Sequence, residues 1–150
     1  MEYDDIEIDF VSRTKKLIEQ YQGEYEATLL INCCIGLLVL PKEKHLNSIP
    51  EVSIEQTGKT WGLSRMAIST DCQECGYKLR NVIRRIRNGI CHFKVNTIPD
   101  GSGKIVRIKI KDRGRFQVIL SIDELKELTF AVADHVINPK QHSERIHCNS

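Results

Sequence analysis

The feature that most constrains the fold is an apolar run from Ala27 to Leu40, which is 14 residues long and contains Asn32. The run is too short to cross a bilayer, so other parts of the chain must cover it. Because apolar side chains fall on nearly every side of a helix drawn through it, the run predicts a central, enclosed helix. This helix begins near Glu24 and ends at Pro41. A chain of 150 residues, 41% of them hydrophobic, is large enough to provide the cover within one domain.

Three further long helices are predicted around this one. The segment from Asp4 to Tyr21 repeats apolar residues at helical spacing. A third helix is expected from about Gly76 to His92. A fourth begins after Ser121, where Ser-Ile-Asp-Glu has the form of a capping box, and it ends at Asn138.

Residues 42–75 show no sustained period. A connection of this length is unusual within a compact domain, so it is expected to contain short helical turns. Four apolar side chains are expected to dock it onto the helices: Trp61, Leu63, Met66 and Ile68.

Between the third and fourth helices, residues 93–98, 104–111 and 116–120 alternate as strands do. In the middle segment, Val106, Ile108 and Ile110 share one face, and Arg107, Lys109 and Lys111 share the other. The expected fold is therefore mainly α, an up-and-down bundle of four long helices with a small antiparallel β-meander, about 93–120, between helices three and four. Residues 1–138 form one domain in this prediction, and residues 139–150 form a flexible tail.

The formal net charge of +2 conceals an uneven distribution of charge. Residues 78–115 hold 12 of the 22 basic side chains and only two of the 20 acidic ones, so this segment carries +10 and the remainder −8. Charge that is segregated in this way indicates a surface facing a polyanion. The alternative is a solvated basic face that pairs with the protein's own acidic half.

The third helix separates an apolar stripe from a polar face. The stripe contains Leu79, Ile83, Ile86, Ile90 and Phe93, and the nearly opposite face contains Asn81, Arg85, Asn88 and His92. Gly89 costs about 1 kcal/mol relative to alanine inside a helix, which indicates that another backbone or a ligand comes close there. Arg84, Arg85 and Arg87 lie within one turn and repel one another, so they need a partner that offsets their charge. A simpler role for His92 is to cap the C-terminus of the helix.

Other motifs are weaker. Cys72 and Cys75 have the spacing of half a zinc site, but no second pair of ligands accompanies them, so ordinary thiols are the simpler interpretation. Gly58-Lys59-Thr60 is similar to the end of a phosphate-binding loop but lacks its leading glycine.

The six cysteines do not have the spacing of a disulfide framework, so reduced thiols are expected. An acidic start without a signal peptide adds the expectation of a cytoplasmic protein that does not enter the membrane.

Arg87, Asn88 and His92 match the motif of the HEPN superfamily: arginine, a polar residue that is often asparagine, three further residues, and histidine. The chain resembles this superfamily over roughly residues 5–137. The motif stands at the end of the third long helix, as it does in the family, and the apolar second helix ends in a similar stretch, residues 37–43. The predicted meander departs from the plainest helical members and resembles an insertion particular to a subgroup.

The resemblance implies a function. Superfamily members with an intact motif are commonly metal-independent endoribonucleases that act as toxins or antiviral defence proteins, which implies RNA as the partner and no cofactor or metal. It makes His92 the acid and base, Arg87 the group that stabilises phosphate charge, and Asn88 a positioning residue. Basic residues around the motif would contact RNA: Arg84, Arg85, Lys94, Arg107, Lys109 and Lys111.

Helical geometry adds a homodimer to this expectation. Arg87 and His92 are five residues apart, so on an ideal helix they diverge by about 140° and do not easily enclose one phosphate. Two copies related by a two-fold axis could present both residues to a shared cleft, in agreement with the dimeric sites of the superfamily. A cognate antitoxin or regulator is a further partner that the resemblance implies.

Two alternatives remain. The chain could be a non-catalytic nucleotide- or RNA-binding module, or the regulatory partner in a two-gene system, since the basic segment would serve binding equally well. It could also be a helical dimer that interacts with protein alone, which predicts no affinity for RNA.

Overall fold

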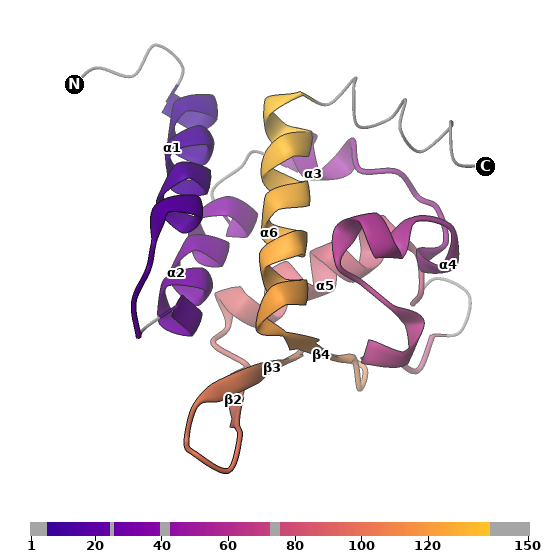
Figure 1. Cartoon of the computed structure of the whole chain (residues 1–150). Helices are drawn as coiled ribbons and strands as arrows, with labels where there is room; N and C mark the ends of the chain where they lie inside the picture. Colours follow the sequence, from indigo (N-terminus) through magenta and orange to yellow (C-terminus); the bar gives the residue numbers. More distant parts are fainter. Residues whose placement is uncertain (1–5, 25, 40–42, 73–75, 139–150) are drawn as a thin grey trace.

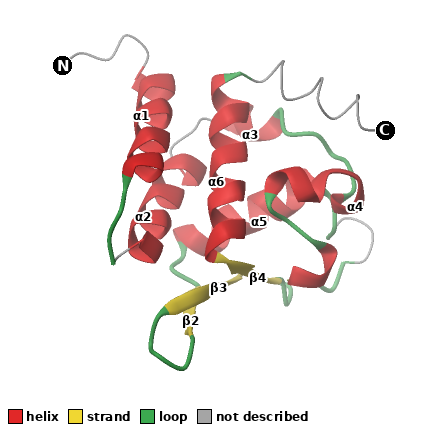
Figure 2. Cartoon of the chain, viewed as in Figure 1, coloured by secondary structure: helices red, strands yellow, loops and turns green. Residues whose placement is uncertain are grey.

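The computed structural model describes residues 6–24, 26–39, 43–72 and 76–138, which form a mainly helical chain with one antiparallel sheet (Figures 1 and 2). The long helices are α1 (Ile6–Gln20), α2 (Glu26–Val39), α5 (Leu79–Cys91) and α6 (Ile122–Ile137). Between α2 and α5 lie two short helices, α3 (Glu43–Asn47) and α4 (Ile54–Thr57), and two 3₁₀ turns, η1 (Gly58–Trp61) and η2 (Arg65–Ala67). The strands are β1 (Ile68–Ser69), β2 (Val95–Pro99), β3 (Ile105–Lys111) and β4 (Gln117–Ser121).

The four long helices predicted from the sequence are confirmed, and their ends lie within three residues of the predicted positions. Helix α2 packs against α1, α5 and α6, and its Leu30 and Leu37 are fully buried, as its apolar composition requires. Figure 1 shows α1, α2 and α6 side by side, with α5 passing behind α6. The up-and-down order of a four-helix bundle stays a prediction. Within the described residues, no helix has both the length and the apolar character needed to cross a membrane.

The sheet has the strand order β1-β4-β3-β2, and each neighbouring pair is antiparallel. The three predicted strands are present, and β1 adds an edge that the sequence did not reveal, because two residues are too few to show a period of two. One face of the sheet is buried, with Ile108, Ile110 and Leu120 at 1% exposure or less. This face turns toward α5 and α6, so the sheet fixes the position of both helices.

The segment between α2 and α5 does contain the short helical turns that were expected. Trp61, Leu63 and Ile68 dock it, since each is 5% exposed or less. The prediction for Met66 is wrong, because its side chain is 99% exposed. Met66 is the middle residue of η2, and the three side chains of a single 3₁₀ turn point in three directions, so one of them leaves the core.

The cysteines only partly follow the expectation of reduced thiols. Cys33 and Cys34 are buried free thiols in α2, and Cys91 is an exposed free thiol at the end of α5. Burial raises the pKa of the Cys34 thiol to about 12. Cys72, however, is disulfide-bonded, so the expectation is wrong at that position. Cys75 and the predicted flexible tail, residues 139–150, lie outside the described residues.

Candidate functional site

Helix α5 is held by the apolar stripe that the sequence predicted. Leu79, Ile83, Ile86 and Ile90 are all 4% exposed or less, and they pack into the common core. Because the stripe occupies one side of the helix, the residues of the motif fall on its flanks and at its end. Arg87 and Asn88 are half-buried, and Cys91 and His92 are exposed.

Gly89 brings α5 against the end of β3. A Cβ atom at this position would lie 2.5 Å from Ile110 Cγ2 and 2.5 Å from the carbonyl oxygen of Lys111. Such distances exclude any larger side chain unless the helix moves, so the expectation that another backbone approaches Gly89 is confirmed. The last turn of α5, which carries the motif, is therefore fixed relative to the sheet.

The end of α5 is a Schellman motif. The N–H of Phe93 donates to the carbonyl of Ile90 at 3.1 Å, and the N–H of Lys94 donates to the carbonyl of Gly89 at 2.8 Å. His92 is the C-cap residue, and its side chain is exposed. Phe93 follows in the left-handed region, with φ of 53°, a position that glycine usually occupies.

The prediction that Phe93 belongs to the apolar stripe is therefore wrong. Its side chain is 80% exposed, because the helix ends at Cys91 and the left-handed backbone takes Phe93 out of the helical period. The spacing rule that placed Phe93 on the stripe assumes a continuous helix, and here the helix has already closed.

Asp112 was missed by sequence reasoning, and it organises the polar flank of α5. Arg85 Nη1 donates to Asp112 Oδ2 at 3.0 Å, and Asn88 Nδ2 approaches the same oxygen at 3.5 Å. The Asp112 side chain is only 4% exposed, beyond the end of β3. The one available signal was that Asp112 is one of two acids in the basic segment 78–115, although its partner residues could not be inferred from that.

The contacts of Asp112 also lower its pKa. Burial by itself raises the pKa of this carboxyl, but hydrogen bonds from the Arg113 backbone, Arg85 and Asn88, together with the charge of Arg85, outweigh burial. Asp112 is therefore a carboxylate at neutral pH. It supplies the offsetting charge that the cluster of arginines on α5 requires.

The predicted RNA-binding residues fall into two groups. Arg85 is engaged with Asp112, and Arg84 Nη2 donates to Asn47 Oδ1 at 2.8 Å, so both have partners within the fold. Four other cations form what we call the basic strand face. They alternate on the side of the sheet away from the buried isoleucines, with Lys109 half-buried and the other three exposed: Lys94, Arg107, Lys109 and Lys111.

The basic strand face begins next to the motif. Lys94 is two residues beyond His92, and its carbonyl accepts a hydrogen bond from the N–H of Lys111 at 3.0 Å. Successive side chains on one face of a strand are roughly 7 Å apart, so Lys111, Lys109 and Arg107 lead away from the end of α5 in one row. The structure therefore places a row of cations beside His92.

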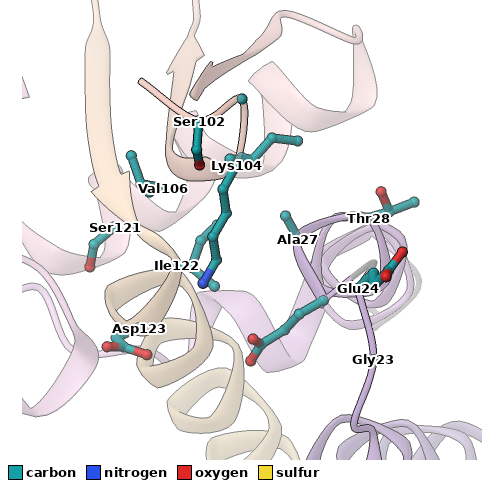
Figure 3. Close-up of a pocket in the computed structure, with 13 residues that line it drawn as sticks. Gly23, Glu24, Ala27, Thr28, Ser102, Lys104, Val106, Ser121, Ile122 and Asp123 are labelled. Carbon is teal, nitrogen blue, oxygen red and sulfur yellow. The ribbon is translucent and has the colours of Figure 1, made fainter. Parts of the chain in front are cut away.

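A cleft of about 870 Å³ lies elsewhere, at the opposite end of β3 (Figure 3). Figure 3 shows that its lining comes from the loop before α2 and the first turn of that helix, from the β2–β3 turn and the start of β3, and from the junction of β4 with α6. It contains Glu24, Glu26 and Asp123 but only one lysine, Lys104, so it suits a polyanion poorly. The N-terminus of α6 in its wall carries the predicted capping box, in which the backbone N–H groups of Ser121 and Glu124 donate to each other's side chains. None of the motif residues lines this cleft.

The weak metal motif gains no support from the structure. Because Cys72 is disulfide-bonded, it offers no thiolate to zinc. In the part of the chain that the structure describes, no three or more His, Cys, Asp or Glu side chains are grouped so that they could hold a metal ion.

The combination of a mainly helical chain with an Arg-Asn-x₃-His motif at the end of a long helix is the combination that defines the HEPN class. The family model described as HEPN pEK499 p136 matches residues 1–143, so the chain belongs to this HEPN family. Comparisons with curated proteins and with solved structures gave no significant match.

Proposed function

We propose that this protein is a metal-independent endoribonuclease of the toxin or antiviral defence type, acting as a homodimer. The observation that carries the proposal is the complete Arg87, Asn88 and His92 motif, with His92 exposed at the rigid end of α5 and the basic strand face beside it. Membership of the HEPN family supports an RNase-like or nucleotide-binding activity.

The chemistry of RNA cleavage suits these residues. The 2′-oxygen attacks the neighbouring phosphorus, the bond to the 5′-oxygen breaks, and a 2′,3′-cyclic phosphate and a 5′-hydroxyl result. His92 takes the proton of the 2′-hydroxyl or gives one to the leaving 5′-oxygen, tasks that imidazole performs near neutral pH. Arg87 stabilises the charge on the phosphorane, because guanidinium stays protonated and donates as a fork. Asn88, held beside Asp112, positions one of these groups.

A homodimer completes the site in this proposal. On an ideal helix Arg87 and His92 would point about 140° apart, so one helix would present only part of a phosphate site. A two-fold axis near the end of α5 would bring the Arg87 of one subunit to the His92 of the other. The basic strand face of each subunit would then guide RNA into the shared cleft.

Cleavage of single-stranded RNA in the presence of EDTA tests the catalytic claim. The wild-type protein is expected to produce fragments ending in 2′,3′-cyclic phosphate. Arg87→Ala and His92→Ala should each lower the rate by about 100-fold or more. Lys16→Ala, which removes an exposed cation on α1, serves as the control and should cleave at the wild-type rate. RNA that stays intact with wild type and both variants alike would contradict catalysis.

The second candidate is a non-catalytic RNA-binding module or a regulatory partner, and the basic strand face favours it to the same degree. This candidate predicts RNA binding that weakens steeply with salt and is unaffected by His92→Ala, without cleavage products. Measuring binding and cleavage on the same RNA separates the two candidates.

A further inference from the structure

We propose that Phe93 is a stacking platform for an unpaired RNA base next to the phosphate that Arg87 and His92 would bind. This inference rests on the proposed function and names the feature of the substrate that the site would recognise. Four observations support it: the exposure of Phe93, its backbone conformation, the hydrogen bonds of the backbone around it and its charged surroundings.

The exposure and the conformation of Phe93 are both unfavourable for the fold alone. An 80% exposed aromatic ring stabilises little by burial. A φ of 53° disfavours a bulky residue, and glycine is the usual choice at this position of a Schellman motif. Strained residues of this kind gather at binding and catalytic sites, which points to a use for the ring outside the fold.

The backbone under Phe93 is fixed on both sides. Its own N–H donates to Ile90, the N–H of Lys94 donates to Gly89, and the carbonyl of Lys94 accepts from Lys111. The ring is therefore held out from the surface by a rigid support. A fixed backbone suits base stacking, since only the two side-chain torsions of Phe93 need to be ordered when the base binds.

The surroundings of Phe93 favour RNA over a second copy of the chain. His92 precedes it, Lys94 follows it, and Lys111 is hydrogen-bonded to Lys94; all three side chains are exposed. In the proposed dimer the ends of α5 face each other across the RNA cleft, so Phe93 borders that cleft. A direct protein contact centred on Phe93 would instead bring Lys94 and Lys111 close to the same cations of the other copy, which is unfavourable. A single strand of RNA would cover the ring with a base and neutralise the lysines with its phosphates.

The test uses protein carrying His92→Ala, so that a fluorescent oligouridine stays intact while its binding is measured by anisotropy. Phe93→Gly should weaken binding about 5- to 150-fold, whereas Phe93→Tyr should bind like the parent. Phe93→Leu should resemble Phe93→Gly, because leucine keeps the apolar surface without the ring. An oligomer with abasic riboses should bind the parent and Phe93→Gly equally. Phe93→Trp adds a fluorescence signal that stacking should quench.

Weaker binding by Phe93→Gly would not result from unfolding, because glycine is favoured at a left-handed position. Its melting temperature should equal or exceed that of the parent protein. Met66→Ala is the matched control, since it removes another exposed apolar side chain, in the turn before the opposite edge strand β1, and should bind like the parent.

If wild type cleaves RNA and Phe93→Gly binds and cleaves equally well, the platform is absent while the proposed function stands. If Phe93→Gly converts dimers to monomers, a second copy covers the ring and the platform is excluded. If wild type neither binds nor cleaves RNA, the proposed function itself fails.

Discussion

At the scale of single residues, Asp112 shows how one buried carboxylate can hold a site together. It accepts from Arg85 and Asn88 across a sequence separation of 27 and 24 residues, and these contacts lower its pKa despite burial. Because the pKa is lowered in the folded state, the carboxylate stabilises the fold above the ordinary carboxyl pKa of about 4. This contribution is lost as the pH falls through the lowered, folded-state pKa.

Asp112→Asn should therefore lower the free energy of unfolding by about 1 to 3 kcal/mol at pH 7, since Arg85 loses its ion pair. The difference from wild type should narrow at pH 3. Urea unfolding at pH 7 and at pH 3 measures the difference in the free energy of unfolding between the variant and wild type at each pH. Asp71→Asn, an exposed aspartate without these contacts, is the control and should behave like wild type. If Asp112→Asn lowers the free energy of unfolding equally at both pH values, the shape of the side chain matters and its charge does not.

At the scale of elements, the contact between α5 and β3 positions the motif. Gly89→Ala gains about 1 kcal/mol of helix propensity, but its Cβ would collide with Ile110 and the Lys111 carbonyl. Overpacking of this kind costs about 1 to 3 kcal/mol, so the variant should be no more stable than wild type and should lose activity as the end of α5 moves. Urea unfolding and RNA cleavage together check this. Gly101→Ala, whose Cβ would meet open space, should change neither, and a more stable, fully active Gly89→Ala would exclude close packing here.

The same element shows what could be predicted from the sequence. The period of the apolar residues located α2 and α5, and the poor helix propensity of Gly89 revealed a close approach, because both are local properties of the chain. The exit of Phe93 from the helical period depends on where the Schellman motif closes, and the role of Asp112 depends on a contact made through the folded sheet. Strand β1 was too short to produce a pattern. The motif could thus be found from sequence, whereas its supports required the fold.

At the scale of the whole molecule, the acidic cleft and the motif lie at opposite ends of β3, and the cations of the basic strand face run between them. The acidic cleft lies at the start of this strand, and the motif and Lys111 lie at its end. RNA approaching the molecule should therefore be drawn to the end of α5 and repelled from the cleft. This arrangement gives the proposed dimer a direction: the ends of α5 would face each other across the RNA cleft, where both motifs can engage one strand of RNA.

Mixed dimers test whether the site is shared between subunits. If Arg87 of one subunit acts with His92 of the other, a dimer of one Arg87→Ala subunit and one His92→Ala subunit contains one intact site and one that lacks both groups. Random pairing makes about half of the dimers mixed, so co-expression should restore about one quarter of the wild-type activity, although each variant alone is inactive. If both groups act within one subunit, every site lacks a group and no activity returns. Mixed dimers can be isolated by giving the two variants different tags and purifying the co-expressed protein through both. If the site is shared, these dimers should cleave RNA at about half of the wild-type rate per dimer, because each keeps one of its two sites.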